Sequence, residues 1–342
     1  MDTQFLEIDD NNFEEATALA AKLLKNGKVI GMPTETVYGL AASAYNEQAV
    51  REIFKVKGRP QDNPIIVHIS DMIMLREVVA DIPPEAVALA KAFWPGPLTM
   101  IFKKSEAIND TVTCKMDTVA VRMPSHPVAK RIIEKCALPI AAPSANLSSK
   151  PSPTTAKHVL DDLHGKIPLI IDAGTCEFGV ESTVISLVES VPTIFRPGII
   201  TLEQIREVVP NATLAKAVLT ELGKDEKAVS PGMKYKHYSP SADVTIVKGS
   251  LKKFAEYAEK NASGNTYAMC FDGENEMISI PSVSYGHIDR PDEQAKKLFT
   301  VLRMLDKAGA TTVFARCPKK DGVSLAVLNR LIRAAGFKVV EL

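Results

Sequence analysis

The feature that most constrains the fold is a repeated alternation of short apolar runs with amphipathic helical stretches. Within residues 1–205, runs of strand length occur at 29–32, 65–69, 98–102, 119–123, 139–143, 169–171 and 184–187. Helical patterns lie between many of them, at 13–24, 47–56, 85–93, 128–135 and 155–163. Strands interleaved with helices predict an α/β layer structure. Several strands follow one another too closely for a helical crossover, so we expect a mixed sheet.

A second alternation of strand and helix patterns starts at residue 243. Strand patterns at 243–247, 266–271 and 311–316 alternate with helical patterns at 251–260, 291–308 and 325–334, and KVVEL closes the chain. These units predict a small parallel sheet. The stretch between the two halves contains GKDEKAVSPGMKYKHYSP, which is polar, basic and rich in turn-forming residues. We therefore predict a first domain over 1–205, a linker over 206–242 and a second domain over 243–342.

Charge and cysteine content exclude several classes of protein. The 342 residues carry 41 basic and 41 acidic side chains, which argues against a protein that coats nucleic acid or an anionic membrane, although a local basic patch is compatible with it. No apolar run approaches the ~20 residues of a membrane span, and the acidic N-terminus lacks the pattern of a secretory signal. The five cysteines are widely spaced, without a CxxC pair. They predict free thiols, and hence a soluble cytoplasmic protein.

Two segments early in the chain carry candidate ligand-binding groups. In MPTETVYGLAASA (32–44), Thr34, Thr36 and Tyr38 alternate in an extended segment, where their hydroxyls would share one face; a solvated turn is an equal alternative. In IFKVKGRPQDNPIIVHIS (53–70), Lys57 and Arg59 lie in a basic cluster that could clamp a polyphosphate or only complement a helix dipole. His68 lies inside the strand that follows, where a satisfied core histidine is the commoner case.

Four later segments add polar groups beside strands. Arg122 interrupts an apolar run, so it either points outward or meets an anion such as a carboxylate. Small residues and hydroxyls in IAAPSANLSSKPSPTTA (140–156) let a ligand approach the backbone, with Ser144 and Asn146 on one face. Ser182 follows two glycines at a strand entry, and Arg196 precedes a Pro-Gly turn. No HExxH, GxSxG or GxxxxGK[ST] motif is present, so zinc, serine-hydrolase and P-loop chemistries lack support.

Seven segments, in their order, resemble the YrdC-type threonylcarbamoyl-AMP synthases. They are PTETVYGLAASA, KxKGRPxxNPIIVHI, FWPGPLT, VAVRMPSHP, APSANLSSKPSPT, GVESTV and RPG. The likeness covers residues 12–205, and SPGMKYKHYSP with the α/β tail resembles the long, two-domain form of the family. It implies an open, twisted mixed sheet with helices around a concave cavity, plus a smaller Rossmann-like α/β domain. It also implies an enzyme that condenses L-threonine, bicarbonate or CO2 and ATP into threonylcarbamoyl-AMP and pyrophosphate.

The resemblance also implies the site residues. ATP would be held by Arg59, Asn63, Thr118, Ser144, Asn146, Ser152, Arg196 and Tyr238. Threonine would be surrounded by Thr36, His68, Arg122, Ala142 and Ser182, with Arg122 pairing its carboxylate. Lys57 and Arg59 would act in catalysis at the phosphates, and Tyr238 in the linker would close over the nucleotide. No side chain is expected to ligate a metal: Mg²⁺ would be carried on the phosphates of ATP, and no organic cofactor is implied.

The implied reaction needs no protein nucleophile, which agrees with the absence of a triad or dyad. Positioned cations would stabilise the charge on the phosphates, and the basic linker would act as a lid that excludes water. The product would pass to the machinery that modifies the adenosine beside the anticodon of ANN-decoding tRNAs.

Two other functions remain open on sequence grounds. One is a carbamoyltransferase of the hydrogenase-maturation type, which would carry acylphosphatase and zinc-finger segments before this module. The other is an RNA-binding module, for which the zero net charge predicts weak RNA binding at most. No membrane partner is expected.

Overall fold

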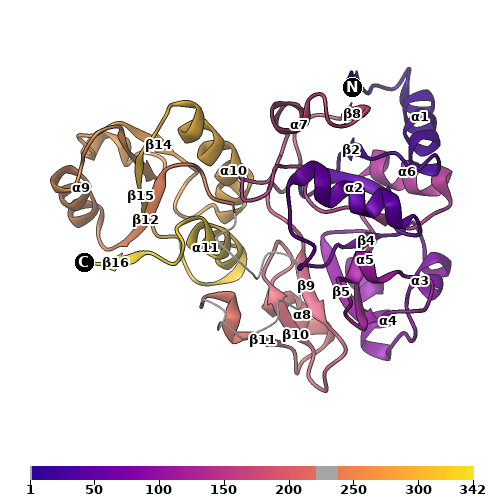
Figure 1. Ribbon diagram of the computed structural model, residues 1–342. Helices are drawn as coiled ribbons and strands as arrows, with labels where there is room; N and C mark the ends of the chain where they lie inside the picture. Colours follow the sequence, from indigo (N-terminus) through magenta and orange to yellow (C-terminus); the bar gives the residue numbers. More distant parts are fainter. Residues whose placement is uncertain (1, 221–237) are drawn as a thin grey trace.

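The computed structural model describes residues 2–220 and 238–342, which form a large and a small α/β body (Figure 1). The small body is the C-terminal one. Within these residues the strands make a sheet of 11 strands, ending at residue 214, and a sheet of 5 strands that starts at residue 243. Residues 221–237, which include most of the predicted lid, lie outside the described residues. The domain limits at 205 and 242 stay a prediction.

The large sheet is mixed, as predicted. Its strand order is β1 (Gln4–Glu7), β8 (Leu169–Asp172), β2 (Ile30–Met32), β3 (Gly39–Ser43), β7 (Ile140–Ala141), β4 (Val67–His68), β6 (Thr118–Arg122), β5 (Leu98–Lys103), β9 (Thr183–Ser186), β10 (Thr193–Arg196) and β11 (Thr213–Leu214). Pairs such as β1–β8 and β5–β9 are parallel, whereas β2–β3 and β5–β6 are antiparallel. Segments far apart in the sequence therefore become neighbours at the centre of the sheet.

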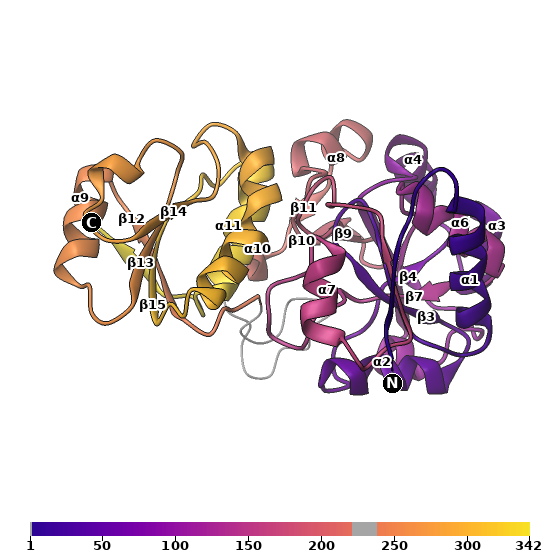
Figure 2. The ribbon, with the colours of Figure 1, turned by 90° about the horizontal axis from the view of Figure 1, so that it is seen from above.

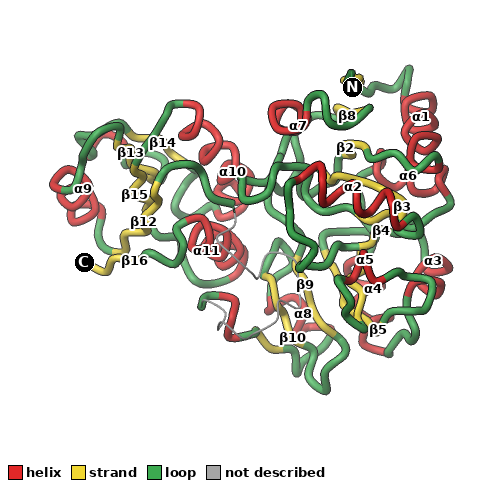
Figure 3. The backbone as a smooth tube through the Cα atoms, in the orientation of Figure 1, coloured by secondary structure: helices red, strands yellow, loops and turns green. Residues whose placement is uncertain are grey.

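Helices cover this sheet, as Figure 3 shows. They are α1 (Phe13–Lys25), α2 (Glu47–Lys57), α3 (Met72–Val78), α4 (Pro84–Phe93), α5 (Asp110–Thr113), α6 (Pro127–Cys136), α7 (Ala156–Leu163) and α8 (Leu202–Val208). The limits of α2 follow from its sequence. The side chain of Asn46 accepts a hydrogen bond from the backbone N–H of Ala49, and Gly58 ends the helix with a φ of 61°. This end places Lys57 in the last turn and Arg59 just beyond it.

Two of the elements that differ from the sequence prediction are β3 and β4. The segment 39–43, which was not among the predicted strands, forms strand β3, all of whose residues are buried. A Cβ at Gly39 would lie 3.2 Å from the Cβ of Ala142, so a side chain here would require a small shift of its neighbour. The run 65–69 was expected to be a strand throughout, but only Val67–His68 pairs as β4. Short, small-residue strands of this kind form through their neighbours and not through their own propensity.

The second sheet is parallel throughout, as predicted. Its order is β14 (Ser282–Ser284), β13 (Thr266–Cys270), β15 (Thr312–Arg316), β12 (Asp243–Lys248) and β16 (Val339–Glu341), crossed by α9 (Leu251–Lys260), α10 (Pro291–Lys307) and α11 (Gly322–Ala334). Single turns of 3₁₀ helix occur at Lys216–Val218 and Asn275–Met277. Figure 2 shows α10 and α11 on the side of this sheet that faces the larger body, and α9 on the far side.

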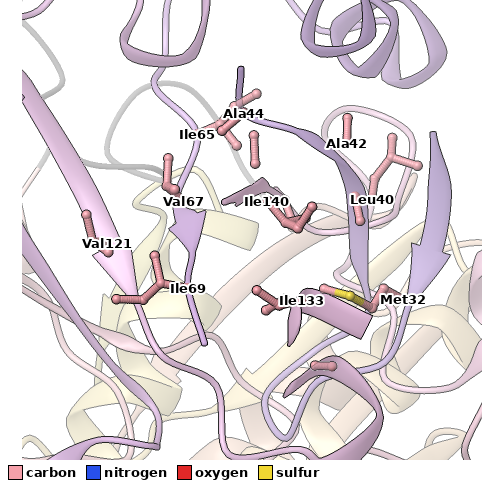
Figure 4. Close-up of a cluster of buried hydrophobic side chains, with 14 of the residues drawn as sticks. Met32, Leu40, Ala42, Ala44, Ile65, Val67, Ile69, Val121, Ile133 and Ile140 are labelled. Carbon is pink, nitrogen blue, oxygen red and sulfur yellow. The ribbon is translucent and has the colours of Figure 1, made fainter. Parts of the chain in front are cut away.

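The core of the large body lies between its sheet and helices. Met32, Leu40, Ala42, Ile133 and Ile140 are completely buried there, and Figure 4 shows them converging from β2, β3, α6 and β7. A second cluster belongs mainly to α10, α11 and the small sheet, yet it includes Val37 and Val180 of the large body. The two bodies therefore share apolar surface. None of the described helices is long and apolar enough to cross a membrane.

The core predicts a clear difference between two apolar substitutions. Leu40→Ala removes a side chain that is 0% exposed at the centre of the sheet, whereas Ile73→Ala removes one that is 72% exposed on α3. We expect Leu40→Ala to lower the free energy of unfolding by about 2–5 kcal/mol, because a cavity remains. Ile73→Ala should change it by less than about 0.5 kcal/mol. Urea unfolding followed by circular dichroism measures both; equal losses would contradict the assigned core.

Candidate active site

One cavity collects residues from the centre of the large sheet and from the segment that enters the small one. Its lining consists of Thr34, Thr36, Val37, Gly39, Arg59, Pro64, Ile65, Ile66, His68, Arg122, Ala142, Pro143, Ser144, Glu181, Ser182, Arg196 and Tyr238. These residues come from β3, β4, β6 and β10, from the loops at 34–37, 59–66, 142–144 and 181–182, and from the segment that precedes β12 (Asp243–Lys248). The strands β3, β7, β4 and β6 are consecutive in the sheet, which explains how residues more than 100 positions apart meet.

The cavity brings together most, but not all, of the residues singled out from the sequence. Those that line it are Thr36, Arg59, His68, Arg122, Ala142, Ser144, Ser182, Arg196 and Tyr238. Lys57, Asn63, Thr118, Asn146 and Ser152 do not line it, so their roles stay predictions that would act through other groups or after a ligand binds. Tyr38 also differs from the sequence prediction. Its hydroxyl donates to the carbonyl of Gly174 (2.7 Å), so Thr34 and Thr36 are the hydroxyls of that segment that face the cavity.

Lys57 and Arg59, in the basic cluster at the end of α2, have different roles. The side chain of Lys57 is buried, and its ammonium donates to the carbonyl oxygens of Ser144 and Asn146 and to Oδ1 of Asn146. Burial, with the nearby Arg59, lowers the pKa of Lys57 well below its usual value. Three acceptors occupy the three protons of an ammonium, so Lys57 holds the Ser144–Asn146 loop in place. Arg59 alone of this cluster lines the cavity, where its guanidinium also donates to the carbonyl of Asn63 (2.8 Å).

Arg122 is buried, and a carboxylate meets it, which was one of the two outcomes predicted. That carboxylate belongs to Glu35: its Oε1 lies 2.6 Å from Nη2 of Arg122. The same guanidinium donates to the hydroxyl of Thr36 (2.8 Å). Burial alone would raise the pKa of Glu35, but Arg122 and the N–H of Ser125 outweigh it and the pKa is lowered. Glu35 was missed from the sequence, although an arginine in an apolar strand was itself a signal that an acidic partner was needed.

Ser182 and Arg196 form a second polar group in the cavity wall. The guanidinium of Arg196 donates to the carbonyl of Ser182 (3.0 Å) and to its hydroxyl (3.1 Å). The hydroxyl of Ser182 is also 2.8 Å from that of Thr99 on β5. Burial lowers the pKa of Arg196 to about 10, so it remains a cation at neutral pH. Neighbouring Glu181, also missed from the sequence, is the one carboxylate among the described residues of the lining.

His68 faces the cavity as a neutral imidazole. It is buried, and its Nδ1 has no hydrogen-bond partner among the described residues, so it is not a satisfied core histidine. Burial, reinforced by the positive charge of Arg122, lowers its pKa to about 3. An unpaired polar atom in a buried wall is available to a ligand.

Tyr238, the first described residue after the gap, lies against the cavity. Its backbone has a φ of 62°, and its ring packs on Phe299 of α10 with centroids 5.2 Å apart. It also belongs to the apolar cluster that contains Val37 and Val180. The C-terminal end of the predicted linker is thus fixed between the cavity and the small sheet.

Comparison with known proteins agrees with this geometry. The profile of a family described as "Telomere recombination" (Sua5, YciO and YrdC proteins) matches residues 22–198, and the profile "Threonylcarbamoyl-AMP synthase, C-terminal domain" matches residues 200–336. The threonylcarbamoyl-AMP synthase of Pyrococcus abyssi is 44% identical over 329 residues, which cover 94% of this chain and 95% of that protein. That of Bacillus subtilis is 41% identical over 344 residues, with 98% of each chain covered.

The chain belongs to the threonylcarbamoyl-AMP synthase family. A crystal structure of P. abyssi Sua5 complexed with L-threonine matches it with a TM-score of 0.92, at 41% identity and with 100% of both chains covered. The predicted family and its two-part α/β fold are therefore confirmed. The roles of individual site residues stay predictions.

The charge of the cavity suits an anionic ligand, as expected in this synthase family. Three arginines, Arg59, Arg122 and Arg196, line it together with a single glutamate. No group of three or more His, Cys, Asp or Glu residues that could hold a metal ion occurs in the part of the chain that the structure describes.

The depressed pKa of His68 predicts a pH dependence of stability. The unfolded chain takes up a proton on this residue below its ordinary pKa of 6.5, whereas the folded chain does so only near pH 3. Stability is therefore lost as the pH falls from 6.5 towards 3, by about 2 kcal/mol between pH 6.5 and 5 for this group. We expect His68→Gln to show a smaller loss than the wild type in urea unfolding at pH 7 and pH 5. An unchanged pH dependence in the variant would contradict a buried, neutral His68.

Proposed function

We propose that this protein condenses L-threonine, bicarbonate or CO2 and ATP into threonylcarbamoyl-AMP, with release of pyrophosphate. The observation that carries the proposal is the single cavity in which three arginines and a neutral histidine meet two threonine hydroxyls, in a chain of this family. The cavity offers cations for phosphates and for a carboxylate, and it offers uncharged groups for the remaining polar atoms of an amino acid.

Arg122, Thr36 and His68 are proposed to bind threonine. A planar guanidinium is suited to two parallel hydrogen bonds with the carboxylate of an amino acid. The carboxylate of Glu35 already forms an ion pair with Nη2 of Arg122, so it fixes the direction in which the other N–H groups of this guanidinium point. His68, neutral and with an unpaired Nδ1, can bond the hydroxyl or the amine of threonine without repelling the amine. Ala142 and Ser182 complete the predicted surroundings.

Arg59, Arg196 and Tyr238 are proposed to hold ATP. The two guanidinium groups supply positive charge for the phosphates, and the ring of Tyr238 supplies an apolar surface close to both. Ser144 lines the cavity at the loop that Lys57 holds, so Lys57 is proposed to support the phosphate site through this loop. Asn63, Thr118, Asn146 and Ser152 are proposed as further contacts on the nucleotide side.

The chemistry that these groups would assist is a displacement at phosphorus. The amine of threonine adds to CO2 and loses a proton, which gives a carbamate. A carbamate oxygen then forms a bond to the α-phosphorus of ATP, while the bond from that phosphorus to the bridging oxygen of pyrophosphate breaks. Alignment of the reactants can contribute about 7–11 kcal/mol, and fixed cations stabilise the charge that develops. Mg²⁺, carried on the phosphates, would supply further neutralisation of their charge.

We further propose that the product is an intermediate for another enzyme. A mixed anhydride is prone to hydrolysis, so its burial behind Tyr238 would protect it from water. The threonylcarbamoyl group would be passed on to the adenosine beside the anticodon of ANN-decoding tRNAs. This role places the protein in the cytoplasm, where tRNA and ATP are present.

Release of pyrophosphate tests the proposed reaction. Purified protein is incubated with ATP, Mg²⁺ and bicarbonate, with and without L-threonine. We expect release that requires both threonine and bicarbonate, and that is much slower with L-serine, which lacks the methyl group. Release without threonine would contradict the proposal and would favour a carbamoyltransferase. Salt-sensitive RNA binding without any turnover would favour an RNA-binding protein.

Substitution of two arginines tests the assignment of the two substrates. Arg122→Gln should mainly raise the KM for threonine and Arg59→Gln mainly the KM for ATP, each by about 10-fold or more, because a charged hydrogen bond is lost. Lys55→Gln is a matched control, since this lysine lies on the same helix as Lys57 with a side chain 79% exposed. Its kinetic constants should equal those of the wild type. Equal effects of both arginine variants on both substrates would contradict the assignment.

A further inference from the structure

Helix α11 of the C-terminal body places an arginine directly behind the wall of the cavity, in contact with the lining residue Glu181. Arg330 is completely buried, and its guanidinium makes four hydrogen bonds. Nε donates to Oε2 of Glu181 (2.9 Å) and Nη2 to the carbonyl of Glu181 (3.0 Å). Nη1 donates to the carbonyl of Pro197 (2.5 Å) and to Oδ1 of Asn329 (3.1 Å). One side chain of the second body thus joins two loops of the first.

These two loops hold or carry groups proposed to contact ATP. The other carboxylate oxygen of Glu181, Oε1, accepts a hydrogen bond from the hydroxyl of Ser152 (2.5 Å). Pro197 directly follows Arg196, whose guanidinium lines the cavity. The loops are also in tight contact, because a Cβ at Gly198 would lie 2.4 Å from the backbone nitrogen of Thr183. A shift of either loop would therefore displace the hydroxyl of Ser152 or the guanidinium of Arg196.

The positions of Glu181 and of its neighbours depend on the positive charge of Arg330. Burial alone would raise the pKa of Glu181, but Arg330 and Arg196 outweigh it, so the pKa is lowered and the group is a carboxylate. A buried carboxylate that loses its partner is strongly unfavourable. Without Arg330, Arg196 is the remaining cation that stabilises Glu181, and it would be drawn away from the hydroxyl of Ser182.

We infer that Arg330 is a positioning residue for the nucleotide part of the active site. It acts through the carboxylate of Glu181 and the carbonyl of Pro197, and these in turn fix Ser152 and Arg196. The C-terminal body is thereby a part of the site and not an appended module. The inference rests on the proposed function for the identity of the ligand, and it adds a residue from a region to which the sequence assigned no chemistry.

A second buried ion pair between the bodies provides a matched control. Arg303 of α10 lies 2.7 Å from Oδ2 of Asp162 on α7, and the side chain of Asp162 is 2% exposed. Neither residue lines the cavity. Asp162→Asn removes the charge of this carboxylate at a comparable buried site, but it keeps Arg303, whose guanidinium also donates to the carbonyl of Pro151 (2.6 Å) next to Ser152.

The experiment measures ATP affinity and turnover in the full-length protein. Equilibrium binding of ATP is measured by calorimetry, and KM and kcat by pyrophosphate release, for the wild type, Arg330→Ala and Asp162→Asn. We expect both variants to have a lower Tm. Arg330→Ala should weaken ATP binding and raise its KM by about 10- to 100-fold, since small displacements of a positioned group have effects of this size. The KM for threonine in Arg330→Ala, and all kinetic constants of Asp162→Asn, should stay within about threefold of the wild type.

Two further variants keep the test decisive. Arg330→Lys covers the case in which Arg330→Ala does not fold, because the ammonium of lysine retains the positive charge. It lacks the forked geometry of a guanidinium, so the KM for ATP should lie between those of the wild type and Arg330→Ala. The double variant Arg330→Ala/Ser152→Ala should be no worse than Arg330→Ala, since both act through Glu181.

Three outcomes would overturn the inference. They are ATP affinity unchanged in both Arg330 variants, an equal rise of the KM for ATP in Asp162→Asn, and additive effects of the Arg330 and Ser152 substitutions. Failure of the proposed function would be distinct from all of these, because the wild type would then release no pyrophosphate in response to threonine.

Discussion

The structure depends on the free energy required to bury arginine. A guanidinium removed from water needs a carboxylate or several carbonyl groups around it, and each buried arginine here finds them on a different segment. Arg122 meets Glu35, which lies 87 positions earlier in the chain, and Arg330 meets Glu181 at a sequence separation of 149. These pairings hold strands and loops in one arrangement, and they leave the remaining guanidinium donors directed at a common space. The same condition that stabilises the fold therefore also prepares the cavity for an anion.

Much of the fold could be predicted from residue patterns. The helix expected at 251–260 is α9 (Leu251–Lys260), and the parallel order of the small sheet follows from the alternation of its strands and helices. The missed strands have a common physical cause. Apart from Leu40, β3 (Gly39–Ser43) consists of small residues with low strand propensity, and β1 (Gln4–Glu7) is largely exposed at an edge. Such strands form because a partner offers hydrogen bonds, and a partner distant in sequence is invisible to a local pattern.

Residue patterns predicted less of the candidate site than of the fold. Hydroxyls and arginines could be selected singly, but the resemblance to a family was needed to join them into one site. Glu35 and Glu181 were missed because an acidic residue among Ser and Thr is usually a solvated one. Arg330 was missed because the pattern of α11 is that of an ordinary amphipathic helix, in which charged residues face water. Burial of charge between two bodies is a tertiary property, so no local pattern reports it.

The long sequence separation between Glu181 and Arg330 has a consequence for the order in which the site is assembled in the cell. Glu181 leaves the ribosome well before α11 has been made, and N-terminal segments begin to fold as they emerge. Until that helix docks, the nascent first body carries a carboxylate without its partner at the place where ATP is proposed to bind. Arg196 is then the cation left to balance this carboxylate, so less positive charge is available for phosphate and an incomplete chain would bind nucleotide more weakly. Full affinity for nucleotide would thus be reached only when the last helix is in position.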